Sequence, residues 1–242
     1  MSDPRSLAQF SAETSDDGRF VRQQSAFRRS VEDRPGAEFP PEAGRYHLYV
    51  SFACPWASRT ILVRKLKGLE DAIGLTVVDP VRDARGWRFG DGSPEKGDPD
   101  PLHGWSLLSE GYALTDPSFD GRVTVPVLWD TKTNTAVNNE SSEIIRMLNS
   151  EFNAFAAHPE VDLYPEELRS EIDELNQRIY DTINNGVYRS GFASTQGAYE
   201  EAVTELFASL DWLEELLGSR RYLTGDQLTE ADWRLAMTLF RF

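Results

Sequence analysis

Cysteine is nearly absent from this chain, whose 242 residues include Cys54 and no other. One cysteine excludes an intrachain disulfide framework and any metal site built from several thiolates. Histidine is also scarce, and His47, His103 and His158 lie far apart without the spacing of metal ligands. The sequence contains no Walker loop, GxSxG elbow or dinucleotide-binding glycine fingerprint. We therefore expect a site that uses no metal.

Basic residues are in a clear minority, with 25 Lys and Arg against 40 Asp and Glu, a net charge of −15. This balance argues against nucleic acid and anionic membrane surfaces, because both require clustered Lys and Arg. No apolar run is long enough to span a membrane, and the first residues lack the apolar core of a signal peptide. We expect a cytoplasmic protein in a reducing compartment, with no membrane partner.

The chain contains enough apolar residues, 40%, to bury a sizeable core. Residues 1–44 are polar and predict an N-terminal extension, although Phe10, Phe20 and Phe27 indicate that parts of it pack down. Residues 45–155 predict an α/β domain, and residues 162–242 an all-helical one, with the boundary near 155–165.

Residues 45–52 alternate between two sets of side chains with the period of a β-strand. Cys54 follows, and residues 55–67 predict a helix that begins at Pro55 and ends at Gly68. A second strand is expected at 75–81. Because strand, helix and strand form a βαβ unit, the two strands should be parallel.

The rest of the chain predicts a hairpin and then helices. The run 123–130, a turn, and residues 135–137 favour two antiparallel strands, and residues 140–149 favour a helix. Beyond about residue 160, apolar side chains recur at helical spacing in two series. These are Leu168, Ile172, Leu175, Ile179 and Ile183, and then Val203, Leu206, Leu210, Leu213 and Leu217.

Cys54 is the first candidate for chemistry. It lies where a strand passes into a helix, so backbone N–H groups and the positive end of the helix dipole would face its sulfur. Such surroundings lower a thiol pKa from about 8.5 towards neutrality. The alternative is a buried cysteine that acts as a small hydrophobe. A dithiol enzyme would carry a second cysteine at Ala57, so an external thiol, glutathione, would have to complete the reaction.

Two further features each have two interpretations. Val125-Pro126 indicates either an edge strand or a cis-proline that turns the Val125 backbone towards a peptide-like ligand. Glu140 and Ser141 begin a helix, where they either cap it or hold the two ends of a γ-glutamyl group. The residues alone leave both questions open.

Five runs of sequence, in order, carry a resemblance to a known family. They are RYHLYVSFACPWA (45–57), GRVTVPVLWD (121–130), NNESSEIIRMLN (138–149), IYDTINNGVY (179–188) and LTEADWRL (228–235). The chain resembles the glutathione transferases over residues 45–242, and within them the glutathionyl-hydroquinone reductases of the Xi class.

The resemblance implies a thioredoxin-like α/β domain followed by a helical domain. It also implies glutathione-dependent reduction of glutathionyl-hydroquinones through a Cys54–glutathione mixed disulfide, in a homodimer. Without the resemblance, Tyr188 would be an amphipathic residue at a helix end and Trp87 a core aromatic. With it, Tyr188 becomes the second catalytic residue. The implied glutathione-binding residues are Trp87, Arg122, Val125, Glu140 and Ser141.

The alternatives are an omega-like thiol transferase or dehydroascorbate reductase, and an inactive glutathione-binding remnant. Family members usually carry His where this chain has Ser58, which bears on how the thiolate is tuned. They also continue with further helices beyond residues 228–235. The last helix, predicted to start with Thr229 and Asp232 as capping residues, is apolar on nearly every face and would need burial all round. We expect a C-terminally truncated chain with an incomplete helical domain.

Overall fold

The computed structural model describes residues 11–242, and this part of the chain divides into two compact units. The first contains residues 24–161, and the second contains residues 11–23 together with residues 162–242. The region expected as an N-terminal extension is therefore divided between the two units where it is described. Phe20 and Phe27 are buried, as expected, while Phe10 lies outside the described residues.

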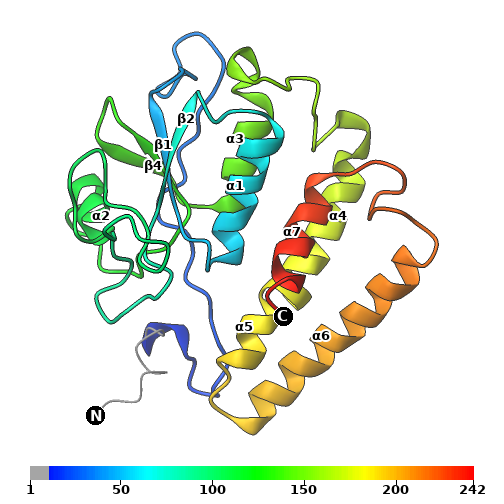
Figure 1. Cartoon of the computed structure of the whole chain (residues 1–242). Coiled ribbons are helices and arrows are strands. Elements are labelled where there is room, and N and C mark those ends of the chain that lie inside the picture. The colour runs from blue at the N-terminus through cyan, green and yellow to red at the C-terminus, as the bar shows by residue number, and fades with distance from the viewer. Residues whose placement is uncertain (1–10) are drawn as a thin grey trace. The chain divides into compact units, whose positions relative to one another are not determined.

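The first unit is built on a four-stranded mixed sheet with the strand order β2-β1-β3-β4 (Figure 1). The strands are β1 (Tyr46–Val50), β2 (Ile73–Val77), β3 (Val127–Asp130) and β4 (Thr135–Asn138). β1 and β2 are parallel, and β3 is antiparallel to both β1 and β4. The predicted βαβ unit and the predicted hairpin are both confirmed.

Three strands are shorter than predicted, and a proline lies near two of the differences. β2 covers Ile73–Val77 and does not reach residue 81: the Asp79 N–H donates to the Arg88 carbonyl and not to β1, and Pro80 has no N–H to donate. β3 begins at Val127 and not at 123, directly after Pro126, which likewise cannot donate. In both places the apolar pattern continues past the proline, but the hydrogen-bonded ladder does not.

Helices cover both faces of the sheet. α1 (Pro55–Leu66) and α3 (Ser141–Ser150) pack together on one face, and α2 (Ser109–Thr115) lies on the other (Figure 1). β1 is an interior strand of this sheet, and all five of its residues are buried. The strand ends at Val50, so Phe52 does not continue its inward face and is 58% exposed. Gly68 follows α1 in the left-handed conformation, as predicted for a helix end.

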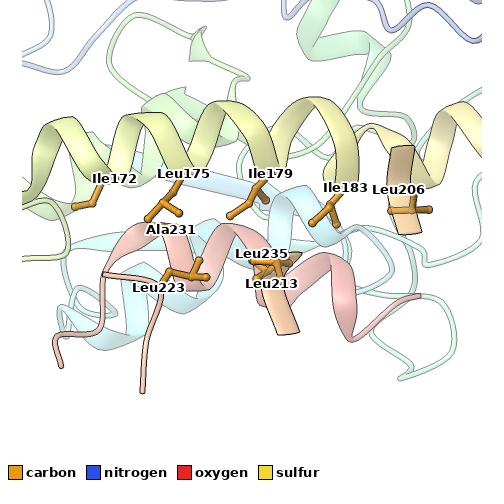
Figure 2. Close-up of a cluster of buried hydrophobic side chains, with 9 residues drawn as sticks. All are labelled: Ile172, Leu175, Ile179, Ile183, Leu206, Leu213, Leu223, Ala231 and Leu235. Atoms are coloured by element: carbon orange, nitrogen blue, oxygen red, sulfur yellow. The ribbon is translucent and has the colours of Figure 1, made fainter. Parts of the chain in front are cut away.

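The second unit is helical. It contains α4 (Arg169–Ile179), the π-helical turn η5 (Tyr180–Asn184), α5 (Gly186–Gly191), α6 (Gln196–Leu217) and α7 (Glu230–Leu239). Its core joins both predicted apolar series to residues around α7 (Figure 2). The cluster consists of Ile172, Leu175, Ile179, Ile183, Leu206, Leu213, Leu223, Ala231 and Leu235.

α7 begins as predicted, with the Thr229 backbone N–H donating to Asp232 Oδ2 at 2.9 Å. One face of the helix, which includes Ala231 and Leu235, is buried. At the C-terminal end of the helix, Phe240 is 79% exposed. The helix is therefore buried on one face and not all round. None of the described helices combines the length and apolar character that a membrane span requires.

The burial of His47 in β1 predicts how the stability of the protein depends on pH. Its ring is 7% exposed, and its Nε2 lies 2.7 Å from Thr76 Oγ1 on the adjacent strand. His47 is therefore buried with a hydrogen-bond partner on the neighbouring strand. Burial lowers the pKa of His47 from 6.5 to about 4.

We predict that the folded protein loses stability as the pH falls through this window. Between about pH 6.5 and pH 4 the unfolded chain binds a proton at His47 that the folded protein excludes, which corresponds to about 3 kcal/mol over the full shift. Urea unfolding at several pH values should show a shallower pH slope for His47→Gln than for the unsubstituted protein. The exposed His158 provides the control, and a His47→Gln slope equal to that of His158→Gln would contradict the prediction.

Candidate active site

The directions of the strands bring three candidate residues to one edge of the sheet. Cys54 follows the end of β1, Glu140 follows the end of β4, and Val125 precedes the start of β3. Because β3 is antiparallel to both β1 and β4, its beginning lies beside their ends. Cys54, Val125 and Glu140 therefore meet although more than 80 residues of chain separate the first from the last.

Cys54 is the N-cap residue of α1, in an extended conformation, with Pro55 as the first helical residue. The Cys54 carbonyl accepts hydrogen bonds from both the backbone N–H and the hydroxyl of Ser58, each at 3.0 Å. The Ser58 hydroxyl thus bonds within the first turn of its own helix. The Cys54 thiol is half-buried and donates to the Val125 carbonyl at 3.5 Å.

Cys54 thus lies where the first-turn N–H groups of α1 have no intrahelical acceptors and the helix dipole is positive. Both effects favour a thiolate over a thiol. The helix start thus supplies part of what a nucleophilic cysteine needs from its surroundings.

Val125 is held beside Cys54 by a buried polar cluster. The peptide bond between Val125 and Pro126 is cis, which corresponds to the second of the two interpretations of this pair. Thr124 donates its N–H to the Tyr112 hydroxyl at 3.1 Å, and the Asn139 side-chain amide donates to Thr124 Oγ1 at 3.2 Å. Burial raises the pKa of Tyr112, so this phenol stays protonated. The cluster joins the residue before Val125 to the residue before Glu140.

Glu140 is the N-cap of α3, and its carboxylate serves as a cap. It accepts hydrogen bonds from the Ser142 backbone N–H at 3.1 Å and from the Ser142 hydroxyl at 2.9 Å. The Ser25 hydroxyl donates to the other carboxylate oxygen at 2.9 Å. Capping is thus observed, and a carboxylate at a helix start remains able to receive an amino group as well.

Ser141, the first residue of α3, is 2% exposed and contacts a buried arginine. Arg59 of α1 lies with its guanidinium 3.4 Å from Ser141 Oγ, and its Cζ is 4.5 Å from the centre of the Trp56 ring. Arg59 therefore links the first turns of α1 and α3. No sequence pattern marks Arg59 or Ser25 as part of the site.

Trp87 and Arg122 lie on loops and are half-buried. Next to Trp87, the Arg88 carbonyl accepts from the Asp79 N–H at 2.8 Å, two residues beyond β2. Because β2 is parallel to β1, this loop leaves the sheet at the same edge as Cys54. Arg122 precedes Thr124 of the polar cluster, on the segment that leads into β3. The loop with Trp87 starts from the edge of the sheet that carries Cys54, and the segment with Arg122 leads to that edge.

Tyr188 belongs to the helical unit, in α5. Its ring stacks on Phe20 and lies close to Phe192, with ring centroids 6.3 Å and 6.0 Å away. The Arg22 guanidinium lies over the same ring. Phe20 is buried, as predicted, but no sequence pattern identifies its partner. Across residues 11–242, no group of three or more His, Cys, Asp and Glu side chains is arranged to hold a metal ion.

Both units match families of known proteins. The glutathione S-transferase N-terminal domain family matches residues 53–151, and the C-terminal domain family matches residues 196–242. Glutathionyl-hydroquinone reductase YqjG from Escherichia coli is 53% identical over 231 residues, which cover 93% of this chain and 70% of that protein. Glutathionyl-hydroquinone reductase PcpF from Sphingobium chlorophenolicum is 52% identical, with the same two coverages.

Solved structures of similar proteins belong to the same family. The glutathione S-transferase Xi from Phanerochaete chrysosporium is 57% identical with a TM-score of 0.90, covering 95% of this chain and 73% of that one. The glutathione-bound structure of Escherichia coli YqjG is 52% identical with a TM-score of 0.85, covering 90% and 72%. This chain therefore belongs to the glutathione transferase family, among the Xi-class glutathionyl-hydroquinone reductases.

Proposed function

We propose that this protein reduces glutathionyl-hydroquinones to free hydroquinones. The Cys54 thiolate attacks the glutathionyl sulfur, a sulfur–sulfur bond forms, and the bond between that sulfur and the ring carbon breaks. The electron pair of the broken bond stays on the ring, which takes up one proton and leaves as the hydroquinone. A second glutathione thiolate then attacks the Cys54–glutathione disulfide, which releases glutathione disulfide and restores the Cys54 thiolate.

One observation carries this proposal: Cys54 caps a helix beside the start of a second helix and beside the Val125 backbone. The first-turn N–H groups of α1 favour a thiolate at Cys54, 3.5 Å from the Val125 carbonyl. Ala57 stands where a dithiol enzyme has its second cysteine, so the disulfide formed at Cys54 is resolved by an external thiol. The relatives named glutathionyl-hydroquinone reductase support the choice of substrate.

We propose that glutathione binds along the edge of the sheet that carries Cys54. Glu140 and the first N–H groups of α3 would hold the amino and carboxylate groups of the γ-glutamyl end, together with Ser141. The Val125 backbone would hydrogen-bond the cysteinyl residue of glutathione in the manner of a neighbouring strand. Trp87 and Arg122 would contact the remainder of the peptide. Residues 45–155 form the glutathione-binding domain in this proposal.

We assign Tyr188 to the proton transfer that accompanies release of the hydroquinone. Its phenol would hydrogen-bond the hydroquinone oxygen and assist delivery of the proton to the ring carbon. Residues 162–242, the helical domain, would thus contribute to the hydroquinone side of the site. We also propose a cytoplasmic location, where glutathione is abundant, and a homodimer; light scattering on the purified protein tests the dimer.

We predict that Cys54→Ser abolishes glutathionylation of the protein. Incubation with glutathione disulfide should add one glutathione to the unsubstituted protein, and none to Cys54→Ser, as measured by mass spectrometry of the intact chain. An unmodified protein would instead indicate an inactive remnant. Ser58→Ala is the matched control, because it removes a hydroxyl that bonds within the same helical turn and leaves the thiol in place.

Tyr188→Phe should slow hydroquinone release and leave Cys54 reactive. Loss of one general acid costs about 10²–10⁴-fold in rate, so release of menadiol from glutathionyl-menadiol with excess glutathione should fall by about that factor. The same variant should still accept glutathione from glutathione disulfide. Rapid turnover of dehydroascorbate without menadiol release by the unsubstituted protein would favour an omega-like thiol transferase.

Glu140→Gln should weaken glutathione binding more than it weakens the fold. A buried or partly buried charge-assisted hydrogen bond contributes about 1.5–3 kcal/mol, so the dissociation constant measured by calorimetry on Cys54→Ser should rise about 10- to 100-fold. Ser142→Ala is the control, since it removes a hydroxyl bonded to Glu140 and keeps the carboxylate. Equal affinities for Glu140→Gln and Ser142→Ala would remove Glu140 from the proposed site.

A further inference from the structure

Residues 11–23 form part of the helical unit, far in sequence from the helices they contact. The Gly18 carbonyl accepts from the Ser194 N–H at 3.0 Å, and the Asp17 carbonyl accepts from the Thr195 hydroxyl at 2.9 Å. Gly18 has φ +86°, and a Cβ there would lie 2.6 Å from Thr195 Cγ2. These contacts attach the segment to the loop between α5 and α6.

The attached segment places two side chains against Tyr188. Phe20 is 5% exposed and stacks on the Tyr188 ring at an interplanar angle of 25°. The Cζ atom of Arg22 lies 4.3 Å from the centre of the same ring. Arg22 Nε also donates to Asn185 Oδ1, and Asn185 is the residue before α5. Arg22 is therefore held at its nitrogen by Asn185 while its guanidinium faces Tyr188.

A guanidinium over an aromatic face is an attractive pairing, and the attraction grows when the ring carries negative charge. Tyr188 gains such charge if its phenol gives up a proton. Other charged groups of the segment and of α5 and α6 form ion pairs: Arg19 with Asp17 and Glu201, and Arg189 with Glu201 and Glu205. Glu13 of the same segment is also buried. The Arg22 guanidinium lies over the ring whose protonation would change.

We propose that Arg22 is a positioning residue for Tyr188. It fixes the orientation of the ring through Asn185 and the cation–π contact, and it stabilises the phenolate that Tyr188 becomes when it donates its proton. This inference rests on the role given to Tyr188 in the proposed function. It also assigns a purpose to the attachment of residues 11–23 to the helical unit.

Arg22→Met tests the proposal, since it keeps much of the side-chain length and removes the charge. The absorbance change on tyrosinate formation, with Tyr188→Phe subtracted to isolate one phenol among eight, gives the pKa of Tyr188. We expect Arg22→Met to raise this pKa and to lower kcat for menadiol release about 3- to 10-fold, with a smaller change in KM. Arg22→Lys keeps the charge, so it should change both the pKa of Tyr188 and kcat less than Arg22→Met does.

Two comparisons make the test specific. Arg19→Met removes another guanidinium of the same segment, one that pairs with Glu201 and Asp17, and should leave the titration of Tyr188 unchanged. In a Tyr188→Phe background, Arg22→Met should lower kcat no further. If Arg22→Met does not fold, Arg22→Gln decides the question, because it removes the charge and retains a donor for Asn185.

The proposal is overturned if the Tyr188 phenol titrates identically with and without the charge at residue 22. It is also overturned if Arg22→Met lowers kcat equally in the presence and absence of the Tyr188 hydroxyl. An unsubstituted protein that releases no menadiol would contradict the proposed function, whereas the titration would still report on the contact between Arg22 and Tyr188. The two ideas can therefore fail separately.

Discussion

The candidate site depends on the direction in which four strands run. With β3 antiparallel to β1 and β4, the starts of α1 and α3 lie at one edge of the sheet, and the segment before β3 lies between them. Two helix dipoles therefore present their positive ends at the same place. This local field exists in a chain whose net charge is −15. In the proposed site, these peptide dipoles would act together with Arg122 on an anionic peptide such as glutathione.

Features encoded within a few residues could be predicted from the sequence. The alternating strand, Cys54 at its end, Pro55 at the first helical position and Gly68 after the helix are all observed, because each follows from local backbone preferences. The start of α7 at Thr229 and Asp232 is local in the same sense. Where the apolar pattern continued past a proline, the predicted strands were too long, since hydrophobicity does not report a missing N–H donor.

Contacts between distant residues could not be predicted in this way. Glu140 and Ser25 are 115 residues apart, and Arg59 and Ser141 are 82 apart, so no local pattern connects either pair. The polar composition of residues 1–44 predicted an extension, yet Phe20 and Phe27 are buried in two different units. The resemblance to a family identifies Tyr188, but only the structure shows which side chains surround it.

The division of the chain into units has a consequence for biosynthesis. Residues 11–23 are made before residues 24–161, yet their partners in α5 and α6 are made after them. During translation this segment therefore lacks its partners, with Phe20 unburied, until the whole first unit and the helical unit as far as the end of α5 have been synthesised. The helical unit is complete only when residues 11–23, the first of its residues to be synthesised, pack against its helices. This contact joins residues far apart in the sequence, so it forms late in folding.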